Sequence, residues 1–98
     1  MDPFEALEDH YPEIIARMGR RFNAHRFIQM LAQMYQGLYI QALAQYADHP
    51  QPFMVVHSRI VWGLARCIDL VQQDGIENST DIFGNSNTAS VWVKRPGM

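Results

Sequence analysis

Four histidines and one cysteine are the residues of this chain best suited to chemistry. A zinc site needs ligands at short, regular spacing, such as two histidines one helical turn apart or two cysteines separated by two residues. No such spacing links the five residues, which are His10, His25, His49, His57 and Cys67. The sequence therefore predicts no metal site and no cofactor.

The sequence does not indicate nucleophilic or acid–base catalysis either. Ser58 follows His57, but neighbouring residues of a helix point apart and do not form a nucleophile–base pair. We expect His57 to be a hydrogen-bonded residue of the core and Cys67 to be a packing residue. The glycines are too widely spaced for a phosphate-binding loop. We therefore predict a protein without catalytic residues, which is not an enzyme.

Charged residues are distributed unevenly along the chain. The formal net charge of −2 argues against a protein that binds nucleic acid unspecifically. Residues 1–10 contain four acids and neither Lys nor Arg. Residues 11–30 contain one acid and four cations, which are Arg17, Arg20, Arg21 and Arg26. Ordinary solvated charges are one explanation, and a weakly basic face beside an acidic N-terminal segment is the other.

Length and composition indicate a single domain spanning residues 1–98. Apolar residues make up 48% of the chain and charged residues 18%, which suffices for one packed core. One cysteine makes no internal disulfide and fits a reducing compartment. No signal peptide or membrane span is recognisable in the sequence. We therefore expect a small cytoplasmic protein that does not contact membranes.

Helical periodicity and the positions of proline and glycine divide the chain into elements. Residues 1–22 are expected to form a helical extension that is interrupted at Pro12. Three helices are predicted after it, at Ala24–Gln36, Leu38–Ala47 and Phe53–Arg66, with Gly37 as the stop between the first two and Asp48–Pro52 as a turn. Two strands are predicted at Ile68–Gln73 and Val91–Arg95, with a polar loop over residues 77–90. Asp74-Gly75 is expected to form a turn. The predicted fold class is α+β.

This order of elements resembles that of the winged helix-turn-helix family over roughly residues 23–95. The resemblance implies a three-helix core, the helical extension before it and a two-stranded C-terminal β-hairpin, the wing. It also implies a DNA-binding or DNA-associated role in transcription regulation, with the third helix in the major groove of duplex DNA. The residues that it nominates for DNA binding are Ser58, Arg59, Arg66, Asn85, Asn87, Lys94 and Arg95, joined by Arg17, Arg20, Arg21 and Arg26 of the basic segment.

The third helix also supports a second class of function. Val55 and Trp62 project from the face opposite the apolar stripe of this helix, where solvent is expected. Exposed aromatic residues are enriched at the centres of protein interfaces. Either an N-terminal helix covers Trp62, or Val55 and Trp62 contact a protein partner, for which we favour a second copy of the chain. The alternative function is therefore a protein-interaction module of the same fold, which uses the Trp62 face and the 77–90 loop.

Overall fold

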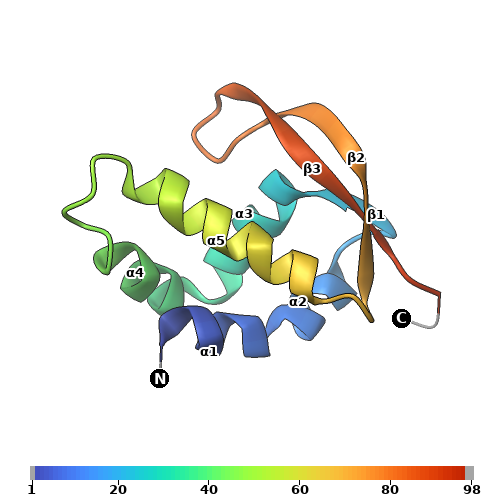
Figure 1. Ribbon diagram of the computed structural model, residues 1–98, viewed down its shortest axis with the longest axis horizontal. Coiled ribbons are helices and arrows are strands. Elements are labelled where there is room, and N and C mark those ends of the chain that lie inside the picture. Colours follow the sequence, from blue (N-terminus) through green and yellow to red (C-terminus); the bar gives the residue numbers. More distant parts are fainter. Residues whose placement is uncertain (1, 97–98) are drawn as a thin grey trace.

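The computed structural model describes residues 2–96 as five helices and a three-stranded sheet (Figure 1). The helices are α1 (Pro3–Asp9), α2 (Tyr11–Arg17), α3 (Ala24–Met34), α4 (Gln36–Ala44) and α5 (Pro52–Arg66). The strands are β1 (Arg21–Asn23), β2 (Val71–Thr80) and β3 (Ser86–Lys94). The predicted α+β class is confirmed.

The sheet has one strand more than the sequence predicted. Its order is β1-β3-β2, and both pairings are antiparallel. The predicted antiparallel hairpin of the two C-terminal strands is present as β2 and β3. The sheet is not two-stranded, because β1 also pairs with β3, with Arg21 opposite Val93 and Asn23 opposite Val91. A strand of three residues is too short to show the alternation by which strands are recognised.

Much of the predicted polar loop belongs to paired strands. Glu77 to Thr80 of β2 pair with Ser86 to Ala89 of β3. Most of these side chains are exposed, because this part of the hairpin extends away from the helices (Figure 1). A strand that faces solvent needs no apolar side chains, so its polar composition looked like that of a loop.

The hairpin turn lies inside the predicted loop of residues 77–90, and Asp74-Gly75 does not form the predicted turn. Asp74-Gly75 forms a bulge inside β2, where Gly75 has a φ of 88° and the register shifts between Gln73 and Ile76. The turn itself joins the strands over residues 81–85. There the Oδ1 atom of Asp81 accepts hydrogen bonds from two backbone N–H groups, those of Phe83 and Asn85, each at 2.9 Å.

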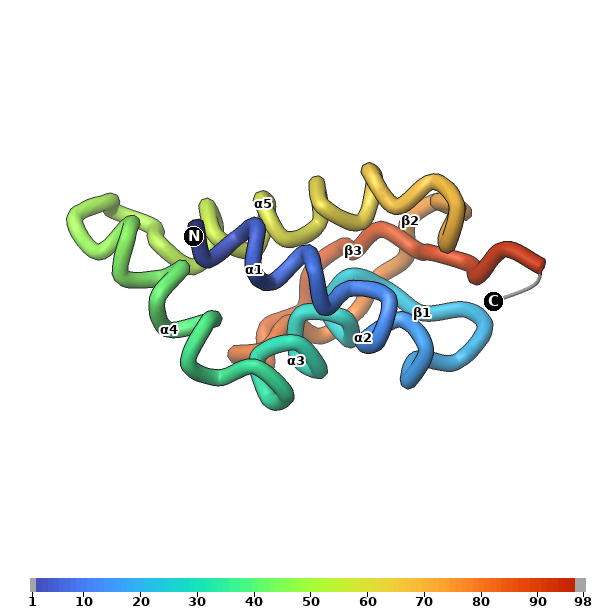
Figure 2. The backbone as a smooth tube through the Cα atoms, turned by 90° about the horizontal axis from the view of Figure 1, so that it is seen from below, coloured from blue at the N-terminus to red at the C-terminus, as the bar shows by residue number. Residues whose placement is uncertain are grey.

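The first 22 residues supply a large part of the core. The side chains of Leu7, Ile14 and Ile15 are fully buried. Tyr11 is also buried, and its hydroxyl donates a hydrogen bond to the carbonyl oxygen of Ile60 on α5 at 2.6 Å. Helix α1 packs on α4 and α5, and α2 packs on α3, as the second view of the backbone also shows (Figure 2). The segment expected as an extension thus belongs to the same packed unit as α3 to α5.

Two predicted helix boundaries shift in the structure. The break between α3 and α4 falls at Tyr35, so Gly37 lies inside α4 and does not end a helix. The predicted helix Phe53–Arg66 is confirmed and begins one residue earlier, at Pro52, because proline suits the first helical position. Its inward stripe is Val56, Ile60 and Leu64, whereas Phe53 at its start is 38% exposed.

Candidate functional site

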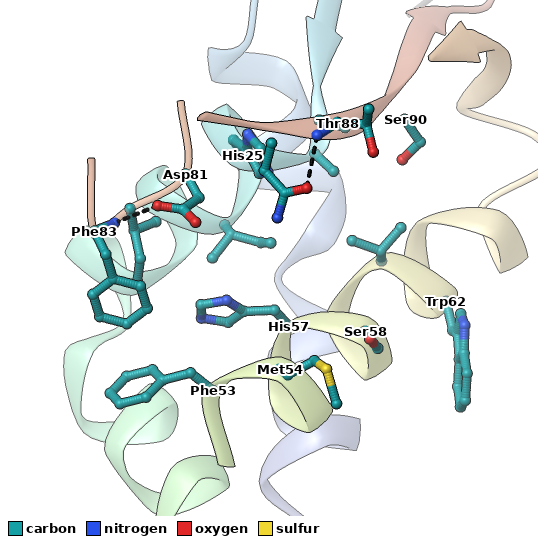
Figure 3. Close-up of a pocket in the computed structure, with 16 residues that line it drawn as sticks. His25, Phe53, Met54, His57, Ser58, Trp62, Asp81, Phe83, Thr88 and Ser90 are labelled. Atoms are coloured by element: carbon teal, nitrogen blue, oxygen red, sulfur yellow. Dashed lines mark hydrogen bonds between the residues drawn. The ribbon is translucent and has the colours of Figure 1, made fainter. Parts of the chain in front are cut away.

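A groove of about 400 Å³ runs between α5, the start of α3 and the β2–β3 hairpin, and we call it the α5 groove (Figure 3). Helix α5 contributes Phe53, Met54, Ser58 and Trp62 to its wall, among others. The hairpin faces them, with Phe83 in its turn. These elements come from distant parts of the chain, so the groove exists only in the folded protein.

The α5 groove exposes an unusual amount of apolar surface. The exposed fractions are 38% for Phe53, 55% for Met54, 63% for Trp62 and 57% for Phe83. Large apolar side chains that gather on one face mark binding surfaces more often than isolated ones do. Asp81 is the one Asp, Glu, Lys or Arg residue among those that line the groove.

One end of the groove is an aromatic corner. The rings of Phe53 and Phe83 meet edge to face with centroids 4.8 Å apart, and His57 packs beside both. The Nε2 atom of His57 lies 2.6 Å from the hydroxyl oxygen of Tyr39. The expected hydrogen bond of His57 is confirmed, but the residue is half-buried and its ring forms part of the groove wall, so it is not a residue of the core.

Burial lowers the pKa of His57 to about 4, and the nearby Asp81 carboxylate only partly opposes this shift. His57 therefore stays neutral in the folded protein at pH 5, whereas in the unfolded chain it titrates at about 6.5.

A lower pKa in the folded state makes stability depend on pH. The contribution of neutral His57 is fully present above pH 6.5 and decreases as the pH falls from 6.5 towards 4. We expect the free energy of unfolding to fall by about 1–2 kcal/mol over this range. This is less than the pKa difference between the folded and unfolded states would give, because the ring is partly solvated. Urea unfolding at several pH values measures it. In the His57→Gln variant, the free energy of unfolding should change less between pH 6.5 and 4 than in the unmodified protein. If the variant shows the same pH dependence, other groups cause it.

The two arginines predicted to read DNA from α5 point to the N-terminal helix. The guanidinium of Arg59 lies 3.9 Å from the centre of the Phe4 ring and donates to the hydroxyl of Tyr46 at 2.8 Å. Arg66 forms a hydrogen-bonded ion pair with Glu8 of α1. These contacts separate Arg59 and Arg66 from Ser58, which lines the α5 groove on another side of the helix.

Of the remaining residues predicted as sites on α5 and the hairpin, some line the α5 groove and others do not. Trp62 is exposed and lines the groove, so no N-terminal helix covers it. Val55 is half-buried and does not line the groove. Asn87 borders the groove, and Asn85 lies in the hairpin turn.

A second surface collects most of the basic residues. The pairing of β1 with β3 joins the two basic segments of the chain, since the backbone N–H of Lys94 donates to the carbonyl oxygen of Arg20 at 2.9 Å. Six of the eight Lys and Arg residues consequently lie around β1 and the end of β3. We call this surface the basic end, and its residues are Arg17, Arg20, Arg21, Arg26, Lys94 and Arg95.

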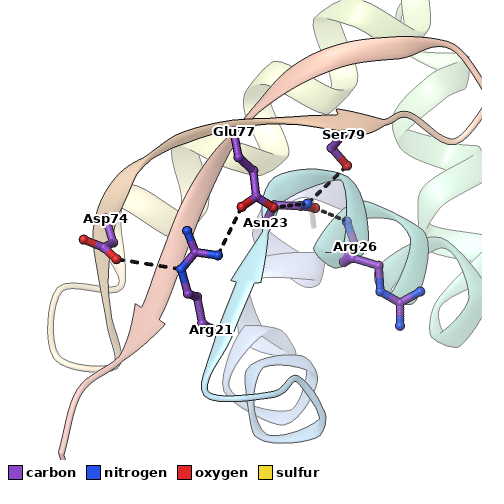
Figure 4. Close-up of polar contacts among 6 residues, drawn as sticks. All are labelled: Arg21, Asn23, Arg26, Asp74, Glu77 and Ser79. Atoms are coloured by element: carbon purple, nitrogen blue, oxygen red, sulfur yellow. Dashed lines mark hydrogen bonds and ion pairs between the residues drawn. The ribbon is translucent and has the colours of Figure 1, made fainter.

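Two carboxylates of β2 partly neutralise the basic end (Figure 4). Arg21 pairs with Glu77 at 3.1 Å and with Asp74 at 3.9 Å. Hydrogen bonds from Asn23 and from Arg21 hold the pKa of Glu77 below its usual range. Asn23 also caps α3 by accepting a hydrogen bond from the backbone N–H of Arg26 at 3.0 Å. This network fixes β1 and the start of α3 against the hairpin.

The alternative function named the 77–90 loop with the Trp62 face, and the structure brings Trp62 and Phe83 to the same groove. The sequence did not single out Asp81 or Phe83 as site residues, and the apolar pair Ile82-Phe83 inside a polar run is the signal for this segment's return to the helices. Ile82 is half-buried against the core, while Phe83 stays largely exposed.

Within residues 2–96, no group of three or more His, Cys, Asp or Glu side chains is arranged to hold a metal ion. None of the helices described is long and apolar enough to cross a membrane. Comparison of the chain with protein-family models, with curated proteins and with solved structures gave no match.

Proposed function

We propose that this chain is a non-catalytic, DNA-binding regulatory protein of the winged helix-turn-helix type, which contacts the phosphate backbone of duplex DNA through its basic end. The observation that carries the proposal is the gathering of six cations at β1 and the end of β3, against the two carboxylates of Asp74 and Glu77. A cytoplasmic location belongs to the same proposal.

The order of the elements supports the winged-helix part. Helices lead into an antiparallel β2–β3 hairpin at the C-terminal end of the chain, as a wing requires. One feature departs from the family pattern. Residues 45–51 separate α4 from α5, whereas a helix-turn-helix joins its two helices by roughly 3–4 residues.

The basic end offers a more suitable DNA contact than α5 does. Arg59 and Arg66 of α5 contact side chains of α1, and Arg59 also contacts Tyr46, which follows α4. The hairpin turn carries no Lys or Arg. A hollow of about 230 Å³ at the basic end is large enough for a phosphate group. Its charged lining residues are Arg17, Arg21, Arg26 and Glu77, of which Glu77 pairs with Arg21. Phosphate contacts fix the position of a protein on DNA without reading bases, so we propose binding with little sequence preference.

Neutralising the basic end should weaken DNA binding and its dependence on salt. We expect the triple variant Arg17→Gln, Arg20→Gln, Arg26→Gln to bind a mixed-sequence duplex at least ~10-fold more weakly at ~50 mM salt. The slope of log affinity against log salt should fall by ~0.9 for each DNA phosphate that the variant no longer neutralises. Fluorescence anisotropy of a labelled duplex over a salt series measures both quantities.

Arg66→Gln is the matched control, because it removes an exposed arginine outside the basic end. It should leave the affinity and the salt slope unchanged. Absence of binding by the unmodified protein at ~50 mM salt would overturn the proposed function. Equal reductions of affinity in the triple variant and in Arg66→Gln would show that the basic end is not the contact surface.

A second function, binding of another protein surface, is supported by the four large apolar side chains exposed around the α5 groove. It does not compete with DNA binding, because the groove and the basic end share no residues.

A further inference from the structure

We propose that the α5 groove is the contact between two copies of this chain, related by a twofold axis that passes close to Ser58. This inference goes beyond DNA binding, because it concerns a different surface and a different partner.

The composition of the groove is that of an interface core. Interface cores are depleted in charged residues and enriched in aromatic residues and methionine. The exposed large apolar members of the groove wall are Phe53, Met54, Trp62 and Phe83. Arg59 and Arg66 of the same helix contact Tyr46 and Glu8 instead. Polar side chains from β3, such as Thr88 and Ser90, supply the rim.

A twofold contact requires a surface that is complementary to itself. Met54, Ser58 and Trp62 are spaced four residues apart along α5 and therefore form one stripe on its outer face. An axis at Ser58 places the two α5 helices antiparallel, so that Met54 of each copy faces Trp62 of the other. Sulfur–aromatic contacts of this kind are favourable. Ser58 is small and exposed, so the two helices can approach closely at the axis.

The twofold arrangement also places a hydrogen-bond donor of the second copy near Asp81, the acidic residue of the groove. Asp81 lies near the start of α5, at the end with the aromatic corner, whereas Trp62 lies at the other end (Figure 3). Antiparallel helices would bring Trp62 of each copy to the Asp81 end of the other. Oδ1 of Asp81 is used by the hairpin turn, which leaves the second carboxylate oxygen for an external donor. The indole of Trp62 is 63% exposed, so a second copy would bring a neutral donor to a carboxylate and an aromatic ring to an aromatic corner.

A second copy explains these features better than a small ligand or an unrelated protein. The anchor, Trp62, and the exposed aromatic corner of Phe53 and Phe83 that would meet it lie on the same face of one chain. A surface built to receive a different partner needs the aromatic corner but not the exposed indole.

Sedimentation velocity over a range of protein concentrations tests the proposal. The unmodified chain should be a dimer, and Trp62→Ala and Ser58→Arg should each raise its dissociation constant ~30-fold or more, since loss of an interface anchor has an effect of this size. Both side chains are exposed, so the helical circular dichroism should not change. Ile76→Ala is the control, because Ile76 is 70% exposed on β2 and does not line the groove.

Disulfide crosslinking tests the position of the axis. In a chain that also carries Cys67→Ala, Ser58→Cys should form a linked dimer on mild oxidation, whereas Ile76→Cys should not. A chain that stays monomeric at ~100 µM would overturn the proposal, as would a dimer that Trp62→Ala leaves intact. A dimer without the Ser58→Cys crosslink would overturn the twofold arrangement.

Discussion

A chain that lacks residues 2–9 should not fold. The deletion removes Phe4 and Leu7, which are 5% and 0% exposed, and it uncovers Tyr11 and the stem of Arg59. Truncating one large buried side chain commonly costs ~2–5 kcal/mol, and a domain of this size is stable by only ~5–15 kcal/mol. We expect the cooperative thermal transition to disappear and the far-ultraviolet circular dichroism to lose most of its helical signal.

A charge variant of the same helix separates packing from electrostatics. Glu5 and Asp9 are exposed on α1, so Glu5→Gln with Asp9→Asn removes two negative charges without removing core side chains. This variant should keep its cooperative transition near that of the unmodified protein. If the deletion variant also unfolds cooperatively at a similar temperature, α1 is a removable extension and not a part of the core.

The longest helix could be predicted because every local signal agreed. Helix α5 starts at a proline, carries an apolar stripe at helical spacing and ends where that stripe ends. Its outward face could also be predicted, and Trp62 is exposed as expected. The partial exposure of Phe53 could not be predicted, because it depends on a contact with Phe83. Phe83 lies in a hairpin turn thirty residues away in the sequence.

The basic end could not be predicted from the sequence as a single surface. Its members lie at residues 17–26 and 94–95, and only the pairing of β1 with β3 brings them together. Three residues of strand carry almost no local signal, so this long-range pairing was missed. The sequence also separated residues 1–22, as an extension, from the core, whereas the structure packs them into it. Helices α1 and α2 are short and are separated at His10, with Pro12 in the first turn of α2 and not at the predicted break. Their apolar side chains nevertheless fill the space between α3, α4 and α5.

Gly63→Ala should destabilise the protein, although alanine is the better helix former. A Cβ atom at Gly63 would lie 2.8 Å from Cε2 and 2.9 Å from the hydroxyl oxygen of Tyr11, and 2.7 Å from Oε1 of Glu8. The Glu8 carboxylate can move, but the Tyr11 ring is 1% exposed and is held by its hydrogen bond to Ile60. Forcing this ring aside costs ~1–3 kcal/mol of overpacking and ~1 kcal/mol of hydrogen bonding, against a helical gain of ~1 kcal/mol. We expect a net loss of about 2 kcal/mol and a fall in melting temperature of about 10 °C.

Gly37→Ala is the matched control and should have the opposite sign. Gly37 also lies inside a helix, α4, but a Cβ atom there would have no neighbour within 4 Å. The substitution should therefore stabilise the protein by ~0.5–1 kcal/mol through backbone entropy alone. Thermal unfolding of the two variants thus separates the cost of the contact between Tyr11 of α2 and Gly63 of α5 from helix propensity. If Gly63→Ala raises the melting temperature as Gly37→Ala does, α2 does not approach α5 as closely as the Tyr11–Ile60 hydrogen bond requires.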